Sequence, residues 1–254
     1  FEDENISHVS GKIDPINDIE TINTELKLAD LEILETKKLA LEKKSKQGDK
    51  DIKNQIKTIE KIINNLNNEE KIISENNEYI NLLNLISLKP LLYACNVEEK
   101  SIARGNKYSQ LVQNTANKEG NDTVIISASI ESQIAELENN DDKLELIKEM
   151  NLNETTLNKL VIAGYNLLNL INFFTCGPKE TRSWTIKKNT FAPEAAGKIH
   201  SDFEKGFIRA ETISYQDYIE FKGEVGSRDS GRLRQEGREY KVKDGDIMHF
   251  LFNI

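Results

Sequence analysis

The sequence predicts a chain of the α/β class in three parts: a partial doubly wound parallel sheet, an inserted antiparallel helical hairpin, and a small β-grasp domain of the ubiquitin-like plan. Apolar residues repeat at alternating spacings of three and four within residues 17–67, which is typical of two paired helices. Two unbroken apolar runs within residues 68–150 are typical of buried parallel strands. Residues 172–254 have the pattern of strand, turn, strand, helix and strand.

The predicted hairpin has one apolar seam on each helix, and these seams indicate a coiled coil. A turn over Ser45–Asp49 separates the helices, with Asp49 as the expected N-cap. At about 1.5 Å per residue, the first helix should be about 40 Å long. Its charged flanks are either a solvated face or a docking arm for a ribosome or protein. The seam residues are Ile19, Ile22, Leu26, Ala29 and Ile33 on the first helix, and Ile52, Ile56, Ile59, Ile63 and Leu66 on the second.

The parallel sheet is predicted from two strands joined by a helix. A helix is expected over about residues 69–87, before Pro90 and the apolar strand Leu91–Cys95. A helix around Tyr108–Ala116 then leads to the second strand, Thr123–Ala128. This order gives a right-handed crossover. Helical residues 131–169 connect to the C-terminal part.

The C-terminal part has one helix among four predicted strands. Proline at the first helical position loses no needed N–H, so Pro193 should open the helix, and Gly206 should stop it. Its expected apolar face is Ala195, Ala196, Ile199 and Phe203. The strands are Phe173–Cys176, ended by Gly177 and Pro178; Arg182–Ile186, which alternates around Trp184; Phe207–Ile213; and Ile247–Phe252.

Composition indicates a soluble protein without a membrane segment, and the family resemblance given below implies a cytoplasmic one. No apolar run approaches the roughly 20 residues of a membrane span, and no signal-peptide pattern occurs. Cys95 and Cys176 fall in predicted strands and are expected to be buried free thiols rather than a disulfide. The net charge of −9 is uneven: residues 172–254 carry 14 basic and 13 acidic side chains, whereas residues 1–171 carry 20 and 30. Contact with RNA is therefore expected only in the C-terminal part.

A family resemblance follows from these residues. The run APEAAGKIHSDFEKGFIRAETISYQDY, with KDGDIMHFLFN at the end, resembles the TGS domain of the YchF subfamily of Obg-related P-loop NTPases, which includes the Obg-like ATPase of eukaryotes. The resemblance extends over most of the chain. It implies that residues 1–16 and 68–170 are a remnant of an Obg-type nucleotide-binding domain, that 17–67 are its coiled-coil insert, and that 171–254 are the TGS domain. It also implies an ATP-binding and ATP-hydrolysing, Mg-dependent protein, related to GTP-binding proteins, that associates with ribosomes in translation.

Two loops are candidates for binding the nucleotide base. Ligands of doubly wound sheets lie beyond the carboxyl ends of the strands, where Asn96–Glu99 and Ser127–Ser129 follow. The pattern N-x-x-E resembles the YchF subfamily, where it replaces N-K-x-D and implies a preference for adenine. Asn96 would offer an amide fork to adenine N6 and N7. Glu99 would replace the guanine-selecting aspartate, Val97 would approach the base by backbone or stacking, and Ser127 and Ala128 would supply backbone groups.

The phosphate-binding motifs do not occur in the 254 residues. Gly11-Lys12 and Gly197-Lys198 fail as P-loops, because Ile6 and Ala192 occupy the position of the first glycine. No D-x-x-G occurs either. The chain begins at Phe1 rather than Met, and we expect missing sequence upstream. The prediction is therefore part of an ATPase that is inactive alone; the alternative is a non-catalytic ribosome, RNA or protein interaction module from a truncated or split gene. A second chain could supply the missing half.

The candidate ribosome or ribosomal-RNA contact is a basic segment near the C-terminus. Its alternative is an ordinary solvated surface. His8, His200 and His249 have no partner at ligand spacing, so they are expected to be structural, and no metal site is predicted. The basic residues are Arg228, Arg232, Arg234, Arg238, Lys241 and Lys243.

Overall fold

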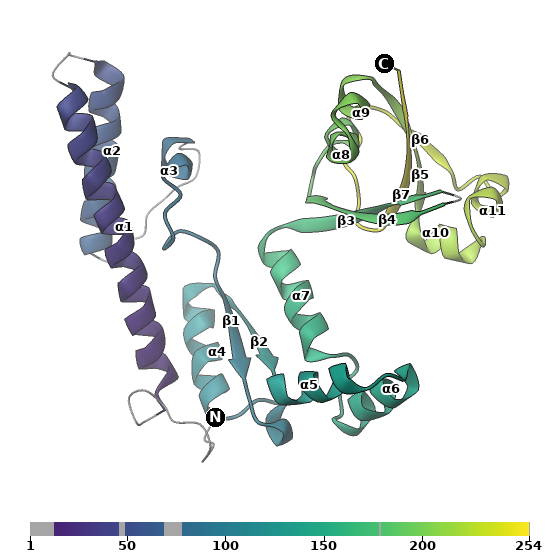
Figure 1. Cartoon of the computed structure of the whole chain (residues 1–254), viewed down its shortest axis with the longest axis horizontal. Helices are drawn as coiled ribbons and strands as arrows, with labels where there is room; N and C mark the ends of the chain where they lie inside the picture. Colours follow the sequence, from purple (N-terminus) through teal and green to yellow (C-terminus); the bar gives the residue numbers. More distant parts are fainter. Residues whose placement is uncertain (1–12, 46–48, 69–77, 178, 254) are drawn as a thin grey trace. The chain divides into compact units, whose positions relative to one another are not determined.

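The computed structural model describes residues 13–45, 49–68, 78–177 and 179–253, and it divides into two compact units, Phe1–Leu160 and Val161–Ile254 (Figure 1). The expectations for His8, Gly11-Lys12 and the middle of the Ser45–Asp49 turn lie outside these residues. Each unit has its own hydrophobic core, and each is described by itself.

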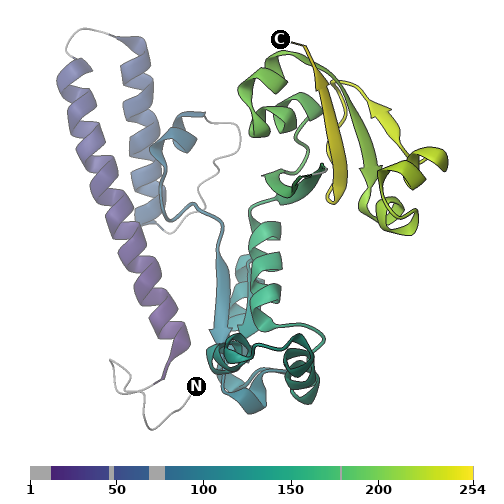
Figure 2. The same cartoon turned by 45° about the vertical axis from the view of Figure 1, so that its right-hand side comes forward.

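A helical hairpin forms the first part of the N-terminal unit (Figure 2). Helix α1 covers Pro15–Ser45 and helix α2 covers Lys50–Asn67. Asp49 caps α2 as predicted, since its Oδ1 accepts the Asp51 N–H at 2.9 Å. The Lys38 ammonium lies 2.8 Å from the Glu60 carboxylate, which joins the two helices. Their shared core consists of Leu34, Ile59, Ile62 and Leu66 with Ile80, Leu83 and Leu85.

The predicted seam was correct in α2 and wrong in part of α1. Ile59 and Leu66 are buried, but Ile22 and Ile33 are 54% and 40% exposed. The inward positions of α1 include Asp30 and Leu34, both fully buried. A carboxylate at the centre of the buried face interrupts the apolar pattern, so hydrophobic spacing assigned the wrong neighbours.

The helix predicted over residues 69–87 ends earlier than expected. Within the described residues, α3 covers Glu78–Leu83, and residues 69–77 lie outside the described part. Asn84 then takes a left-handed conformation with φ 52°, which ends the helix. The chain turns because Asp30 Oδ1 and Oδ2 accept the backbone N–H groups of Ile86 and Ser87, at 2.9 and 2.8 Å.

A parallel β-strand pair follows, with the predicted helix between its strands. Strand β1 covers Leu92–Asn96, α4 covers Lys107–Glu119 and β2 covers Asp122–Ile126. The strands are half-exposed rather than buried, because β1 pairs only with β2 among the described residues. The second strand ends two residues earlier than predicted, since Ser127 is the N-cap of α5 and Ala128 is already helical.

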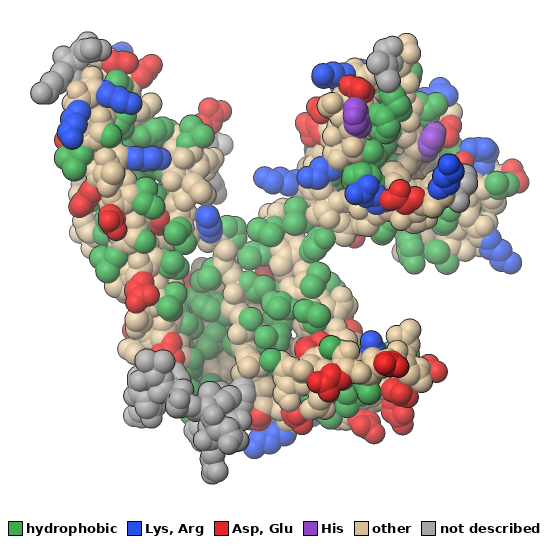
Figure 3. Space-filling model, viewed as in Figure 1, with side chains coloured by type: hydrophobic (Ala, Val, Ile, Leu, Met, Phe, Trp, Pro, Cys, Tyr) green, Lys and Arg blue, Asp and Glu red, His purple; other side chains and the backbone are tan. Residues whose placement is uncertain are grey.

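Three helices and one 3-10 turn complete the connection. The 3-10 turn η1 covers Glu99–Ser101, and the helices are α5 (Ala128–Glu136), α6 (Asn140–Glu149) and α7 (Thr156–Leu167). A core of Ile102, Ile130, Ile134, Ile147 and Leu152 packs η1, α5 and α6 together. Asp and Glu side chains gather over α5 and α6 on the face shown in Figure 3.

The C-terminal unit contains a five-stranded mixed sheet of order β4-β3-β7-β5-β6. Strands β3 and β7 are parallel, and the other neighbours are antiparallel. All four predicted strands are present, and a short fifth one, β6, was not predicted. Their bounds are β3 Leu170–Cys176, β4 Thr181–Lys187, β5 Phe207–Ser214, β6 Arg234–Glu236 and β7 Asp246–Phe252.

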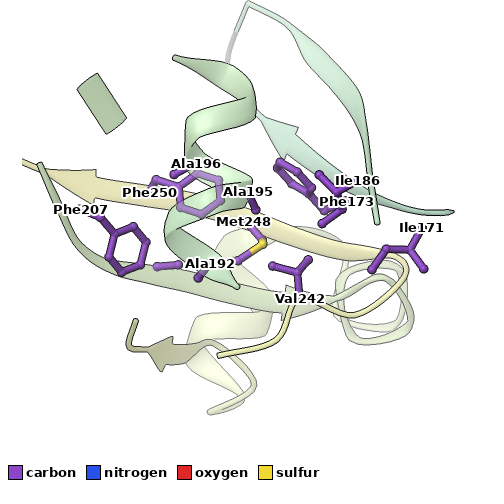
Figure 4. Packing of buried hydrophobic residues seen from close by; sticks show 11 residues of the cluster. Ile171, Phe173, Ile186, Ala192, Ala195, Ala196, Phe207, Val242, Met248 and Phe250 are labelled. Carbon is purple, nitrogen blue, oxygen red and sulfur yellow. The ribbon is translucent and has the colours of Figure 1, made fainter. Parts of the chain in front are cut away.

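Helix α8, Ala192–Ile199, packs on one face of this sheet (Figure 4). Ala192, Ala195 and Ala196 are fully buried, which lets the helix approach the aromatic rings beneath it. Phe173 lies at the centre, with its ring edge-on to Phe250 at 5.8 Å and stacked near Trp184 at 6.5 Å. Burial of these side chains stabilises the unit.

The single helix predicted from Pro193 to Gly206 is two helices. His200 is extended, with φ −157°, and ends α8. Its Nδ1 accepts the Asp202 N–H, so it caps α9, Ser201–Lys205. Two further short helices, α10 (Tyr215–Glu220) and α11 (Glu224–Asp229), follow β5.

Both cysteines lie in strands, as predicted, and neither forms a disulfide. They are only partly buried, contrary to the expectation. No helix in the described residues is long and apolar enough to cross a membrane. The described part of the chain also holds no group of three or more His, Cys, Asp or Glu suited to a metal ion.

Candidate functional site

The five predicted base-binding residues come together at one edge of the β1–β2 pair. The strands are parallel, and Asn96 lies opposite Ile126 at their carboxyl ends. Ser127 and Ala128 follow directly, as the N-cap and the first residue of α5. The two loops therefore begin at the same level, where parallel α/β sheets hold their ligands.

Asn96 fastens the two loops to each other. Its side-chain Oδ1 accepts the backbone N–H of Ala128 at 3.0 Å. A carbonyl oxygen can accept a second hydrogen bond, and the amide NH₂ group retains its two donors. The side-chain oxygen of the amide predicted to read adenine is thus already hydrogen-bonded within the protein. This contact also orients the NH₂ group of the same amide.

Two neighbouring glutamates have different local roles. Glu98 accepts the Ser101 hydroxyl at 2.6 Å and the Asn106 amide at 2.8 Å, so it joins η1 to the start of α4. Glu99 Oε1 accepts the Ser129 hydroxyl at 2.7 Å and the Gln133 amide at 2.8 Å, on α5. Glu99 therefore forms a second tie between the two loops, beside the one made by Asn96.

Val97 is enclosed. Its side chain is 2% exposed, and its N–H donates to the Ile126 carbonyl at 2.9 Å. Stacking of the Val97 side chain on a base does not fit this enclosed conformation. Direct contact between Val97 and a base stays a prediction.

Ser127 is held from behind by two residues that the sequence reasoning missed. Thr156, at the start of α7, is fully buried, and its Oγ1 lies 3.4 Å from the Ser127 nitrogen as acceptor. Glu131 Oε1 accepts both the N–H and the hydroxyl of Thr156, at 2.6 Å each. The helix-start signal of α7 is the preceding Thr155, whose Oγ1 accepts the Asn158 N–H at 3.0 Å, and no sequence pattern marks Thr156 itself. The Ser127 hydroxyl is buried and has no hydrogen-bond partner in the described structure.

A cavity of about 300 Å³ adjoins this edge, between β1, the start of α1 and the start of α4. Asn96, Val97, Asn106 and Tyr108 contribute to its wall. Its lining combines apolar side chains with a few polar ones, a composition that suits a small heteroaromatic ligand.

The acid stability of this loop should depend on Glu98. The Ser101 hydroxyl, followed by the Asn106 amide and the nearby Lys100 charge, holds the pKa of Glu98 at about 2, below the ordinary 4.5. A carboxylate whose pKa is lowered by folding stabilises the folded state at a pH above its ordinary pKa. This stabilisation is lost as the pH falls from about 4.5 to about 2. The free energy of unfolding of the N-terminal unit can be measured by urea denaturation followed by circular dichroism. Between pH 4.5 and 2 it should change less steeply with pH in Glu98→Gln than in the wild type. The control is Glu136→Gln, which should keep the wild-type slope; equal slopes in all three proteins would contradict the assignment.

Each of the four arginines proposed for RNA contact lies near an acceptor group of the same unit. Arg228 pairs with Glu224 at 2.7 Å, and Arg232 lies 3.7 Å from Asp217. Arg234 pairs with Glu236 at 3.1 Å, and Arg238 donates to the Phe207 carbonyl at 2.8 Å. On the face shown in Figure 3, basic side chains are spread around the C-terminal unit. Lys243 lines one hollow together with Arg234 and a second one together with Lys241. Contact of this segment with RNA stays a prediction.

Fold and loop geometry define an α/β protein with a candidate ligand-binding edge at parallel strand ends. The chain is 47% identical to the ribosome-binding ATPase YchF of Escherichia coli O157:H7, over 100% of this chain and 71% of that protein. It is 43% identical to the ribosome-binding ATPase YchF of Bacillus subtilis, with the same coverage. The structure of the Schizosaccharomyces pombe YchF GTPase matches with a TM-score of 0.83 and 34% identity, over 98% of this chain and 69% of that one. Residues 170–253 match the family YchF-GTPase_C, described as a protein of unknown function (DUF933).

This chain belongs to the YchF family. The identity extends along the whole chain, so the family covers both compact units.

Proposed function

We propose that this chain is part of a YchF-type NTPase that binds an adenine nucleotide at the edge of β1 and β2 and associates with ribosomes in the cytoplasm. The observation that carries the proposal is identity of 47% along the whole chain to proteins named ribosome-binding ATPases. The joined loops of Asn96 and Ala128 supply the geometry for the base.

The base end of a nucleotide fits the residues present. Asn96 has free amide donors at a site fixed by the Ala128 N–H, and Glu99 places a carboxylate beside it. The buried Ser127 hydroxyl lacks a partner among the described residues, and a buried polar group of this kind is expected to gain one. Adenine, with both donor and acceptor edges, could supply such hydrogen bonds directly or through water.

The phosphate and metal ends do not fit. The 254 residues contain no P-loop motif, and the described residues hold no carboxylate cluster for Mg²⁺. Phosphoryl transfer depends on a phosphate cradle and a metal, so no hydrolytic step is assigned to these residues. The alternative proposal, a non-catalytic interaction module, is favoured by the same observation.

We expect adenosine nucleotides, rather than guanosine nucleotides, to perturb the amide signals of Ala128 and Ser129 in nuclear magnetic resonance titrations of the whole chain. Asn96→Ala removes the contact that joins the loops and should weaken this response at least about tenfold, the effect of losing one or two buried hydrogen bonds. Asn114→Ala, on exposed α4, is the matched control. The same sample should release no phosphate from ATP. Equal responses to adenosine and guanosine would overturn adenine recognition.

The proposed domain bounds are 17–67 for a coiled-coil insert, 1–16 and 68–170 for the nucleotide-binding domain, and 171–254 for a TGS domain. The sheet order β4-β3-β7-β5-β6, with α8 across it, supports a β-grasp in the last of these. The paired α1 and α2 support the helical insert. TGS domains are regulatory and RNA-binding modules in the family resemblance, which supports the proposal of a ribosome contact in this unit.

A further inference from the structure

Two adjoining hollows form a continuous surface of polar and apolar side chains in the C-terminal unit. One has a volume of about 800 Å³ and lies between the end of α7, the start of β3 and the loops at residues 188–189 and 241–244. The other, of about 660 Å³, extends along β3 to the start of α10. Both are lined by Asn172, Lys243 and Asp244, so they meet at these residues. We call the combined surface the lysine groove, after Lys188, Lys241 and Lys243 in its wall.

The positive charges of the lysine groove are available to a ligand. The ammonium groups of these three lysines form no ion pair with any residue that the structure describes. Lys241 lies 5.8 Å from the Phe191 ring, a contact that leaves its ammonium exposed to an anion. The only acidic side chain in the larger hollow, Asp244, is engaged by the Asn172 N–H at 2.8 Å. Unlike the arginines of residues 228–238, these lysines are not held by internal partners.

Aromatic rings and amides line the same groove. Tyr165 is in the larger hollow, and Phe174 and Tyr215 are in the smaller one, with ring centroids 6.4 Å apart. The Tyr215 side chain is 54% exposed. Asn172 Oδ1 accepts the Thr185 hydroxyl at 2.8 Å, which orients its amide NH₂ group. Three more amides, those of Asn166, Asn169 and Asn189, complete the polar wall.

We propose that the lysine groove binds a single-stranded RNA segment, with its lysines on the phosphates and its aromatic rings on the bases. Cationic grooves interleaved with aromatic side chains are how proteins hold single strands, because every base has a face that can stack. Amides add hydrogen bonds to exposed base edges. An acidic protein segment would satisfy the lysines but would leave the rings and amides unused. The proposal deepens the ribosome association proposed above, since it names the chemistry of the contact.

The test is fluorescence anisotropy of the whole chain with a labelled 12-nucleotide single-stranded RNA over a series of salt concentrations. The triple variant Lys188→Gln, Lys241→Gln, Lys243→Gln should bind about tenfold more weakly at low salt and lower the salt slope by about two, since each phosphate contact on a single strand contributes about 0.7. The control triple variant changes Lys179, Lys198 and Lys205 to Gln, which removes the same charge elsewhere on the unit and should leave the affinity within about twofold.

Stacking is tested separately from charge. Tyr215→Ala should weaken binding about fivefold or more, whereas Tyr215→Phe, which keeps the ring, should bind as the wild type does. Three results would overturn the proposal: an equal loss of RNA affinity in the two triple lysine variants, no loss of RNA affinity in Tyr215→Ala, or tighter binding of poly-glutamate than of RNA.

Co-sedimentation with ribosomes separates this inference from the proposed function. If the wild type and the triple variant of the groove lysines sediment equally well with ribosomes, ribosome association is supported and the groove is rejected as the contact. If the wild type binds the RNA oligonucleotide but not ribosomes, ribosome association is rejected and RNA binding in the groove is supported.

Discussion

Asp30→Ala should lower the free energy of unfolding of the N-terminal unit by about 3–5 kcal/mol, because each hydrogen bond to a charged group contributes about 1.5–3 kcal/mol. Asp30 is fully buried in α1, and its two oxygens accept the N–H groups of Ile86 and Ser87. Alanine would leave both donors without a partner in a half-buried turn. Asp30→Asn keeps one acceptor and should lose about half as much.

Chemical denaturation followed by far-ultraviolet circular dichroism measures this loss, since the helical hairpin dominates the signal of its unit. Amide hydrogen exchange at Ile86 and Ser87 should accelerate in the variant. Glu32→Ala is the control, because Glu32 is an exposed residue of the same helix. A variant as stable as this control would show that the turn at residues 84–89 does not depend on Asp30.

Asp246→Ala should destabilise the C-terminal unit by a similar amount, about 3–5 kcal/mol, because it removes two hydrogen bonds to a charged group at about 1.5–3 kcal/mol each. Asp246 is 2% exposed, and its Oδ2 accepts the Tyr240 hydroxyl at 2.7 Å and the Lys243 N–H at 2.9 Å. Arg234 lies 3.7 Å from Oδ1. Burial and then the Asp246 carboxylate raise the pKa of Tyr240, so the variant should also make this phenol easier to ionise.

The fluorescence of Trp184, the single tryptophan, reports unfolding of this unit alone. Asp229→Ala, an exposed acid at the end of α11, is the control and should change stability by less than about 0.5 kcal/mol. Because Asp246 fixes the backbone of Lys243, Asp246→Ala should also weaken binding in the lysine groove. Retained stability together with an unchanged Tyr240 titration would contradict the assigned network.

Local pattern alone predicted much of the secondary structure. Alternation around Trp184 and the apolar runs that became β1 and β2 were sufficient to place strands, since side-chain periodicity follows directly from strand geometry. Asp49 and Pro193 marked helix starts because capping depends on neighbours in sequence. The family resemblance, which the comparisons confirm, located the candidate base-binding loops at strand ends.

The sequence by itself therefore determined the strands of both sheets except β6, the starts of α2 and α8, and the family to which the chain belongs. Only the tertiary structure decided which polar side chains act together. It placed Asp30 inside the hairpin, tied Glu99 to α5, put Thr156 behind Ser127, and brought Lys188 beside Lys241 and Lys243. Periodicity records which face of an element is apolar, but it carries no information about partners that are 29 to 57 residues away in the chain. Those pairings depend on how the elements pack.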